Sequence, residues 1–184
     1  MSELQLKILH TLIEYSDFQR NPNGESTLKL TAADRYAGPM DEKQMIEFLE
    51  REKVMMRLGM IDEDGYPMVH PVWFAYEDGS LWAVVERTSR KARVLRKNTK
   101  VYFTIDKSAY PPKGVRGRGT ALLIEDDSLA LKVTKKHLLK YHGTIDDDYA
   151  RDFLDSPHEQ VIVKVSPIYL ATWDYARTRH PTVP

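Results

Sequence analysis

Basic and hydroxyl residues are concentrated in one short segment of the chain. Between Arg87 and Lys100 there are seven basic residues and no acidic one, at positions 87, 90, 91, 93, 96, 97 and 100. Thr88 and Ser89 add two hydroxyl groups. Where a helix begins, its first backbone N–H groups lack partners within the helix, and the helix dipole adds partial positive charge. Hydroxyls, free amides and Lys91 at one point therefore predict a phosphate site.

Two other interpretations of this basic segment stay open. The first is a solvated helix face that Ser89 merely caps. Arg90 and Lys91 argue against it, because cations in a first turn oppose the helix dipole unless an anion is bound. The second is contact with nucleic acid, which nothing else in the sequence supports. Lys+Arg and Asp+Glu are both 27, so the chain has no net charge with which to hold a polyanion.

A second candidate segment is the aromatic stretch at residues 68–74, Met-Val-His-Pro-Val-Trp-Phe. Pro71 has no backbone N–H, so this strand is expected at a sheet edge or at a bulge. Backbone groups left free there could meet the edge of a flat heterocycle, with Val72 or Trp73 against its face. The alternative is that the same side chains form core and interface. His70 is either a ligand contact or a structural residue.

Several catalytic classes lack their motifs. The chain has no Cys, which excludes disulfides, thiolate metal sites and Cys nucleophiles. It has no nucleophile elbow, no P-loop and no dinucleotide fingerprint. Its six histidines form no metal-binding pair, so no metal site is expected. A phosphate site and an aromatic slot without catalytic side chains indicate that a bound cofactor carries the chemistry.

The elements that must position these segments are mainly antiparallel strands. Apolar residues alternate, and Asp64-Gly65 and Asp78-Gly79 are hairpin signals. Strands are expected at residues 54–61, 67–76, 81–87, 101–105, 115–124 and 160–173, the first three as a meander. Helices are expected after Asp41, at residues 90–97 and 128–142, and around Tyr149 and Phe153. The pattern predicts a mainly β fold, a small antiparallel barrel of about six strands with short flanking helices.

A length of 184 residues fits one main domain, expected at residues 41–175. Residues 1–40 form an N-terminal extension with apolar residues at helical spacing (Leu6, Leu9 and Ile13), and residues 176–184 form a tail. No apolar run approaches the ~18 residues of a membrane span. The N-terminal stretch lacks a continuous apolar leader. We therefore expect a cytoplasmic protein with no membrane partner.

Four segments, in this order, resemble the pyridoxamine 5′-phosphate oxidase-like flavin-binding split-barrel superfamily. They are Asp64-Gly65-Tyr66-Pro67, His70-Pro71-Val72-Trp73-Phe74, Ser89-Arg90-Lys91-Ala92-Arg93 and Gly117-Arg118-Gly119-Thr120-Ala121. The resemblance implies a six-stranded split β-barrel, a homodimer, and FMN at each of two sites between subunits. On that pattern the phosphate contacts would be Arg87, Thr88, Ser89, Arg90 and Lys91. The ring contacts would be His70, Pro71, Val72 and Trp73, and the second subunit would add Tyr110, Arg116 and Trp173.

The activity that the resemblance implies is that of an FMN-dependent oxidoreductase, passing hydride through flavin N5 to or from a small molecule. Its alternatives are a non-catalytic flavin sensor or carrier, a reductase that uses a deazaflavin cofactor, and a haem-binding relative. For haem, His70 and His137 are the candidate ligands. The C-terminal signature of true pyridoxamine phosphate oxidases is matched only loosely, at Trp173-Asp174-Tyr175-Ala176-Arg177. Synthesis of vitamin B6 is therefore not the expected role.

Overall fold

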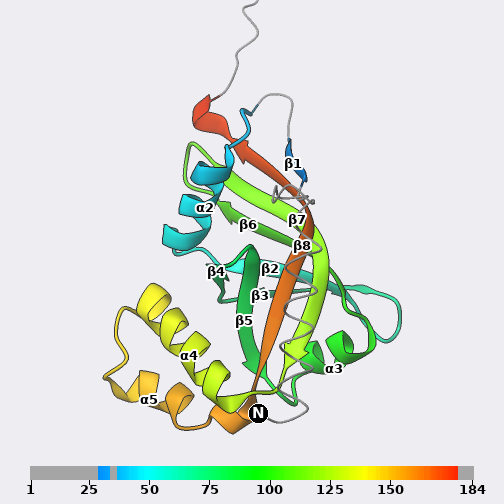
Figure 1. Ribbon diagram of the computed structural model, residues 1–184. Helices are drawn as coiled ribbons and strands as arrows, with labels where there is room; N and C mark the ends of the chain where they lie inside the picture. The colour runs from blue at the N-terminus through cyan, green and yellow to red at the C-terminus, as the bar shows by residue number, and fades with distance from the viewer. Residues whose placement is uncertain (1–28, 34–36, 178–184) are drawn as a thin grey trace, which may run out of the picture.

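The computed structural model describes residues 29–33 and 37–177 as one antiparallel sheet with helices around it (Figure 1). The strands are β1 (Lys29–Ala32), β2 (Met56–Ile61), β3 (Pro67–Val72), β4 (Ala75–Glu77), β5 (Ser80–Glu86), β6 (Lys100–Lys107), β7 (Lys113–Ile124) and β8 (Gln160–Asp174). Their order is β3-β2-β6-β7-β8-β5-β4, and β1 alone runs parallel to its neighbour, β8. The expected mainly β split-barrel architecture is confirmed, with β1 as an additional strand and with one expected strand divided into β3 and β4.

Five helical elements flank the sheet at its two ends. They are α2 (Glu42–Arg51), α3 (Arg90–Lys97), α4 (Asp127–His137) continued by the π-helical turn η1 (Leu138–His142), and α5 (Asp148–Leu154). Two 3-10 turns, η2 (Pro157–Glu159) and η3 (Tyr175–Arg177), lie before and after β8. In Figure 1, α4 and α5 lie on one side of the sheet near the start of β8, and α3 lies on the other side.

Local sequence signals explain where these helices begin and end. Asp41 and Gln44 form a capping box at the start of α2, the helix expected after Asp41. The Ser89 hydroxyl accepts a hydrogen bond from the backbone N–H of Ala92 at 3.3 Å, which caps α3 as predicted. The helix expected at residues 128–142 is found as α4 and η1, and it ends at Gly143 in the left-handed conformation (φ 100°).

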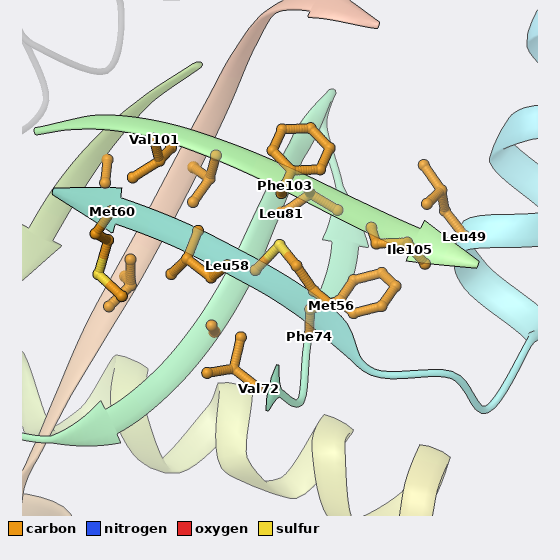
Figure 2. Close-up of a cluster of buried hydrophobic side chains, with 14 of the residues drawn as sticks. Leu49, Met56, Leu58, Met60, Val72, Phe74, Leu81, Val101, Phe103 and Ile105 are labelled. Atoms are coloured by element: carbon orange, nitrogen blue, oxygen red, sulfur yellow. The ribbon is translucent and has the colours of Figure 1, made fainter. Parts of the chain in front are cut away.

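The hydrophobic core is formed by the inner face of the sheet together with the buried faces of α2 and α3. Figure 2 shows that Met56, Leu58 and Met60 of β2 point to the same side as Phe103 of β6. All four side chains are buried, and the alternation in β2 places the intervening residues outward. Such a period of two is what one buried sheet face requires. This core fixes β2, and β2 in turn positions β3.

The longest ladder in the sheet joins β7 to β8. It is interrupted once, where Gly119 pairs with Pro167 and Arg118 pairs with Tyr169, so that one residue of β8 is extra. The ladder therefore has a β-bulge at this point. A Cβ atom at Gly119 would lie 2.3 Å from the Ser166 backbone oxygen, so only glycine fits there.

The last pairing of the three-strand meander predicted for residues 54–87 is found only beside the turn, where Ala75 and Tyr76 pair with Trp82 and Leu81, and it fails beyond that point. The predicted strand at residues 67–76 breaks at Trp73 and Phe74 into β3 and β4, and β3 pairs with β2 alone. At the break, the Phe74 backbone bonds to the Tyr141 hydroxyl instead of to a strand. β5 pairs along its length with β8, whose run of buried residues from Val161 offers a longer apolar partner. The sheet consequently stays open between β3 and β5.

The described part of the N-terminal extension packs on the main domain. β1 pairs with β8 over residues 169–172, and the Arg177 guanidinium donates to the Pro39 carbonyl oxygen at 2.9 Å and to Gln44 Oε1 at 2.6 Å. The helical spacing of Leu6, Leu9 and Ile13 and most of the expected C-terminal tail lie outside the described residues.

Candidate functional site

The split between β3 and β5 contains a cavity of about 580 Å³. β3 has β2 on one side only, and β5 pairs with β4 only as far as Trp82, so facing stretches of both strands lack a ladder partner. Pro71 and Val72 line the cavity from β3, and Val84 and Val85 line it from β5. A volume of this size falls within the range of small-molecule sites, ~300–1,000 Å³. The split therefore offers free backbone groups and apolar side chains to one ligand.

Of the aromatic segment, Pro71, Val72 and Trp73 line this cavity. The Trp73 ring stacks on the Tyr141 ring of η1, with centroids 5.2 Å apart and planes 5° apart. The expectation of an edge position for Pro71 is met, because β3 ends the sheet. His70 does not line the cavity. Burial lowers the pKa of its imidazole, and the positive charges of Lys91 and Arg90 lower it further.

Lys91 lies in the first turn of α3 and is the only Lys or Arg that lines the cavity among the described residues. Its ammonium makes no ion pair within the described part of the chain, whereas four arginines around it are all paired with carboxylates. The pairs are Arg87 with Glu125 and Asp127, Arg90 with Asp62 and Glu63, Arg93 with Glu63, and Arg96 with Glu125. Of the predicted phosphate contacts, Lys91 is thus the cation that remains available.

The structure does not bring the other predicted phosphate contacts into the cavity. Arg87 donates to the Gln160 carbonyl oxygen as well as to its two carboxylates, and Arg90 turns toward the β2–β3 turn. The Thr88 hydroxyl donates to the Glu86 carboxylate, and the Ser89 hydroxyl donates to the Glu86 carbonyl oxygen at 2.6 Å. The arginines fasten α3 to neighbouring loops, a use that the run of basic residues in the sequence does not reveal.

Arg116 and Trp173 lie on another face of the molecule, where they line a second cavity of about 860 Å³. This cavity is built on the outward side of β2, β3, β6 and β7, and Val69 and Tyr102 line it with exposed apolar surface. Tyr110 lies between β6 and β7 and is 94% exposed. One chain therefore does not bring these three residues to the cavity that contains Lys91.

The remaining wall of the first cavity comes from helices that the sequence reasoning did not assign to the site. α5 contributes Tyr149, Asp152 and Phe153, and α4 contributes Thr134 and His137. Tyr149 and Phe153 lie on the helix expected around them, but their distance from residues 71–91 in the sequence hides the fact that both segments line one cavity. Glu86, Ser156, Glu159 and Gln160 complete the wall.

His137 and Gln160 hold this helical wall in place. His137 Nε2 lies 2.9 Å from the Trp82 carbonyl oxygen. Because a carbonyl oxygen only accepts, Nε2 carries the proton. Burial lowers the pKa of His137 to about 4, so the ring is neutral near pH 7. Thr134 donates to Gln160 Oε1 at 2.7 Å, and Gln160 Nε2 donates to the Phe153 carbonyl oxygen at 2.7 Å, which ties α4 to α5.

Neither a metal centre nor a membrane span is found in the described parts of the chain. No three His, Asp or Glu side chains among residues 29–33 and 37–177 are grouped to hold a metal ion. No helix in the same ranges has both the length and the apolar character needed to cross a bilayer.

Comparison with known proteins gives a family match and several structural matches. The family model described as pyridoxamine 5′-phosphate oxidase matches residues 41–174. A conserved hypothetical protein from Mycobacterium tuberculosis superposes with a TM-score of 0.67 at 24% identity, covering 84% of this chain and 98% of its own. A FAD-binding protein from Mesorhizobium loti superposes with a TM-score of 0.54 at 20% identity, covering 74% of this chain and 96% of its own. An F420 reductase superposes with a TM-score of 0.50 at 20% identity, covering 68% of this chain and 94% of its own. No curated protein matches the sequence.

Proposed function

Since the chain belongs to the pyridoxamine 5′-phosphate oxidase family, we propose that it is a flavin-dependent oxidoreductase with FMN in the cavity between β3 and β5. The observation that carries the proposal is Lys91, a cation in the first turn of α3 that has no ion pair within the described residues and lines the same cavity as Pro71 and Trp73. A lone cation beside a helix N-terminus is suited to a phosphate. The free edges of β3 and β5 are suited to the polar edge of a flat ring.

The residues have separate roles in this proposal. Lys91 neutralises the phosphate, and the backbone of residues 71–72 hydrogen-bonds the ring edge. Trp73, held flat by Tyr141, covers one ring face and excludes water from it. When bound, the flavin supplies two-electron transfer at N5 of its ring. Because a deazaflavin also carries a phosphate, Lys91 would serve it equally. The FAD-binding and F420-reductase matches support a flavin-type cofactor and leave its identity to measurement.

A second copy of the chain is part of the proposal. Arg116 and Trp173 would reach the ring only from a partner, because within one chain they line the other cavity. Val69, which is 61% exposed, and Tyr102, which is 47% exposed, give that face apolar surface for a partner to cover. Sedimentation velocity should accordingly give the mass of a homodimer.

The haem alternative is less well supported by the geometry. His137 is buried and its Nε2 is bonded to the Trp82 carbonyl oxygen, so that atom is not free to bind iron. His70 is the remaining candidate, and it lies outside the cavity lining. The absorption spectrum and mass of the small molecule released on denaturation distinguish FMN, deazaflavin and haem. Reduction of the bound flavin by NAD(P)H with turnover of an acceptor would distinguish an enzyme from a flavin carrier.

The proposed site is tested by substitution of Lys91. Lys91→Ala should weaken FMN binding by about 1.5–3 kcal/mol, the scale of a hydrogen bond to a charged group. Lys97→Ala is the matched control, because Lys97 is an exposed lysine in the last turn of the same helix. Titration of the flavin-free protein, followed by quenching of flavin fluorescence, gives both affinities. An FMN affinity unchanged by Lys91→Ala would refute the assignment.

A further inference from the structure

Helix α5 turns one face toward the cavity in the split, and that face has a distinct chemistry. Tyr149, Asp152 and Phe153 are spaced i, i+3 and i+4, so they share one side of the helix, and all three line the cavity. Tyr149 is 47% exposed and Phe153 is 39% exposed in the single chain. Large aromatic side chains exposed together at a cavity mark a surface that a ligand can cover.

The aromatic rings of this face continue across the cavity to β3. The centroid of the Phe153 ring is 5.1 Å from that of Tyr149 and 6.3 Å from that of Trp73. The Phe153 ring is edge-on to Tyr149, with 61° between their planes, and tilted by 37° to Trp73. Three rings around one space provide electron-rich faces for a flat ligand or a cation.

The charge of this part of the cavity is negative. Asp152 makes no ion pair within the described residues, whereas nearby Asp148 and Asp147 are paired with Arg151 at 2.7 Å and with His142 at 2.6 Å. Glu159 also lines the cavity, and no basic group within the described residues pairs with it. Lys91, the only Lys or Arg in the lining among the described residues, is assigned above to the phosphate. An aromatic wall with an unpaired carboxylate attracts cations and repels anions.

We propose that Tyr149, Asp152 and Phe153 form a substrate subsite that selects flat aromatic cations over anions of the same shape. Tyr149 and Phe153 contact the ring, and Asp152 faces its positive charge. The inference rests on the proposed function in one respect, because it takes the bound flavin as the neighbour of this subsite. It names the chemical class of the substrate, which the family membership leaves open.

Three probes with one ring system and different charges test this subsite. N-methylquinolinium is the cation, quinoline the neutral ring and quinoline-4-carboxylate the anion. Each is titrated by calorimetry into the flavin-loaded dimer and into the flavin-free protein. We expect the cation to bind tightest and the anion weakest. Asp152→Asn should weaken the cation about fivefold, which is about 1 kcal/mol at 1.4 kcal/mol per tenfold, and should leave quinoline unchanged.

Two further variants separate charge from packing. Asp148→Asn removes a carboxylate from the same helix that is already paired with Arg151, so it should leave all three affinities unchanged. Phe153→Leu should weaken all three probes, including neutral quinoline, because it removes ring contact that they share, and it should weaken the cation most because only the cation gains a cation–π contact. Equal binding of cation and anion, or a cation affinity that Asp152→Asn does not alter, would overturn the subsite.

The outcomes also distinguish the two proposals. If the protein holds flavin but shows no preference for the cation, the subsite fails and the proposed function stands. If the cation is preferred through Asp152 but the protein holds no flavin in either the wild type or the Lys97→Ala control, the subsite stands and the proposed function fails.

Discussion

The two halves of the sheet are built from the same kind of strand but differ in how completely their strands pair. In the closed half, β6, β7 and β8 pair along their length with one bulge between β7 and β8, and glycines 114, 117 and 119 let the backbones and side chains of neighbouring strands come close. In the open half, β3 and β5 approach each other without pairing and leave a cavity between them. Backbone groups that are hydrogen-bonded between strands in the closed half are left free at the strand edges in the open half, where a ligand can bond to them.

The same contrast holds for the charges around α3. The arginines that face the turns and β7 are paired with carboxylates, so they stabilise the position of the helix. Lys91, which faces the open half, has no such partner in the described chain. Charge that is already paired contributes little to binding a new anion, because its field is largely cancelled. The availability of a cation, more than the number of cations, therefore marks the binding side of α3.

The largest expected effect comes from breaking the closed half. Gly119→Val should lower the free energy of unfolding by roughly 4 kcal/mol, because its Cβ would lie 2.3 Å from the Ser166 backbone oxygen and neither strand can move away freely. Urea denaturation followed by circular dichroism measures the loss. If the closed half only supports the site, FMN binding should weaken only to the extent that the protein unfolds.

Gly65→Ala is the control for this substitution. Gly65 has φ +87°, but a Cβ there would meet nothing within 4 Å. The expected loss is therefore about 1 kcal/mol of backbone strain alone. A loss at Gly119 no larger than that at Gly65 would show that β7 and β8 are not closely packed at the bulge.

The sequence was sufficient for most of the fold because its signals are local. The capping residues Asp41 and Ser89, the end of a helix at Gly143 and the bulge at Pro167 depend on neighbours a few residues away. The pairing of β5 with β8 depends on residues about 80 positions apart, and alternation in β5 is equally compatible with β3 as partner. The predicted pairing of residues 67–72 with the strand at 81–87 is wrong for that reason.

The candidate site was predictable only in part for a similar reason. Lys91 and Trp73 stand in recognisable segments, and the structure brings both to one cavity. The use of Arg87 and Arg90 in ion pairs depends on acids 27 to 40 residues away, which a sequence pattern does not locate. The residues of α5 that line the cavity are separated even further along the sequence, since Asp152 follows Trp73 by 79 positions.

The buried imidazole of His137 lines the cavity in the open half of the sheet. Burial lowers the pKa of His137 to about 4 from an ordinary value of about 6.5, the charge of Lys140 acts in the same direction, and the bond to Trp82 opposes both. The unfolded chain therefore takes up a proton at a higher pH than the folded chain. The stability contributed by neutral His137 is full above pH 6.5 and is lost as the pH falls toward 4, by about 3 kcal/mol in all.

Urea titrations between pH 7.5 and 4 test this slope. His137→Gln keeps a polar side chain without a group that titrates in this range, so its free energy of unfolding should fall less steeply with pH than that of the wild type. His158→Gln removes an exposed imidazole and should leave the wild-type slope unchanged. Identical slopes in wild type and His137→Gln would contradict the buried neutral state of this residue.

The smallest expected effect concerns the hydroxyl of Tyr141, which bonds to the backbone at the break between β3 and β4. The Tyr141 hydroxyl donates to the Val54 carbonyl oxygen at 3.0 Å or to that of Phe74 at 3.2 Å, and it accepts from the Phe74 N–H at 3.3 Å. Tyr141→Phe keeps the stack on Trp73 but removes these bonds. We expect a loss of about 1 kcal/mol in the free energy of unfolding.

Tyr66→Phe is the matched control for this last change, because Tyr66 is 70% exposed and its hydroxyl makes no hydrogen bond within the described chain. If the hydroxyl of Tyr141 holds the strand break open for the ligand, Tyr141→Phe should also shift the fluorescence of Trp73 and raise the Kd for FMN a few-fold. A loss of stability with neither change would mean that Tyr141 supports the core alone. The open half would then owe its shape to β2 and not to the π-helical turn.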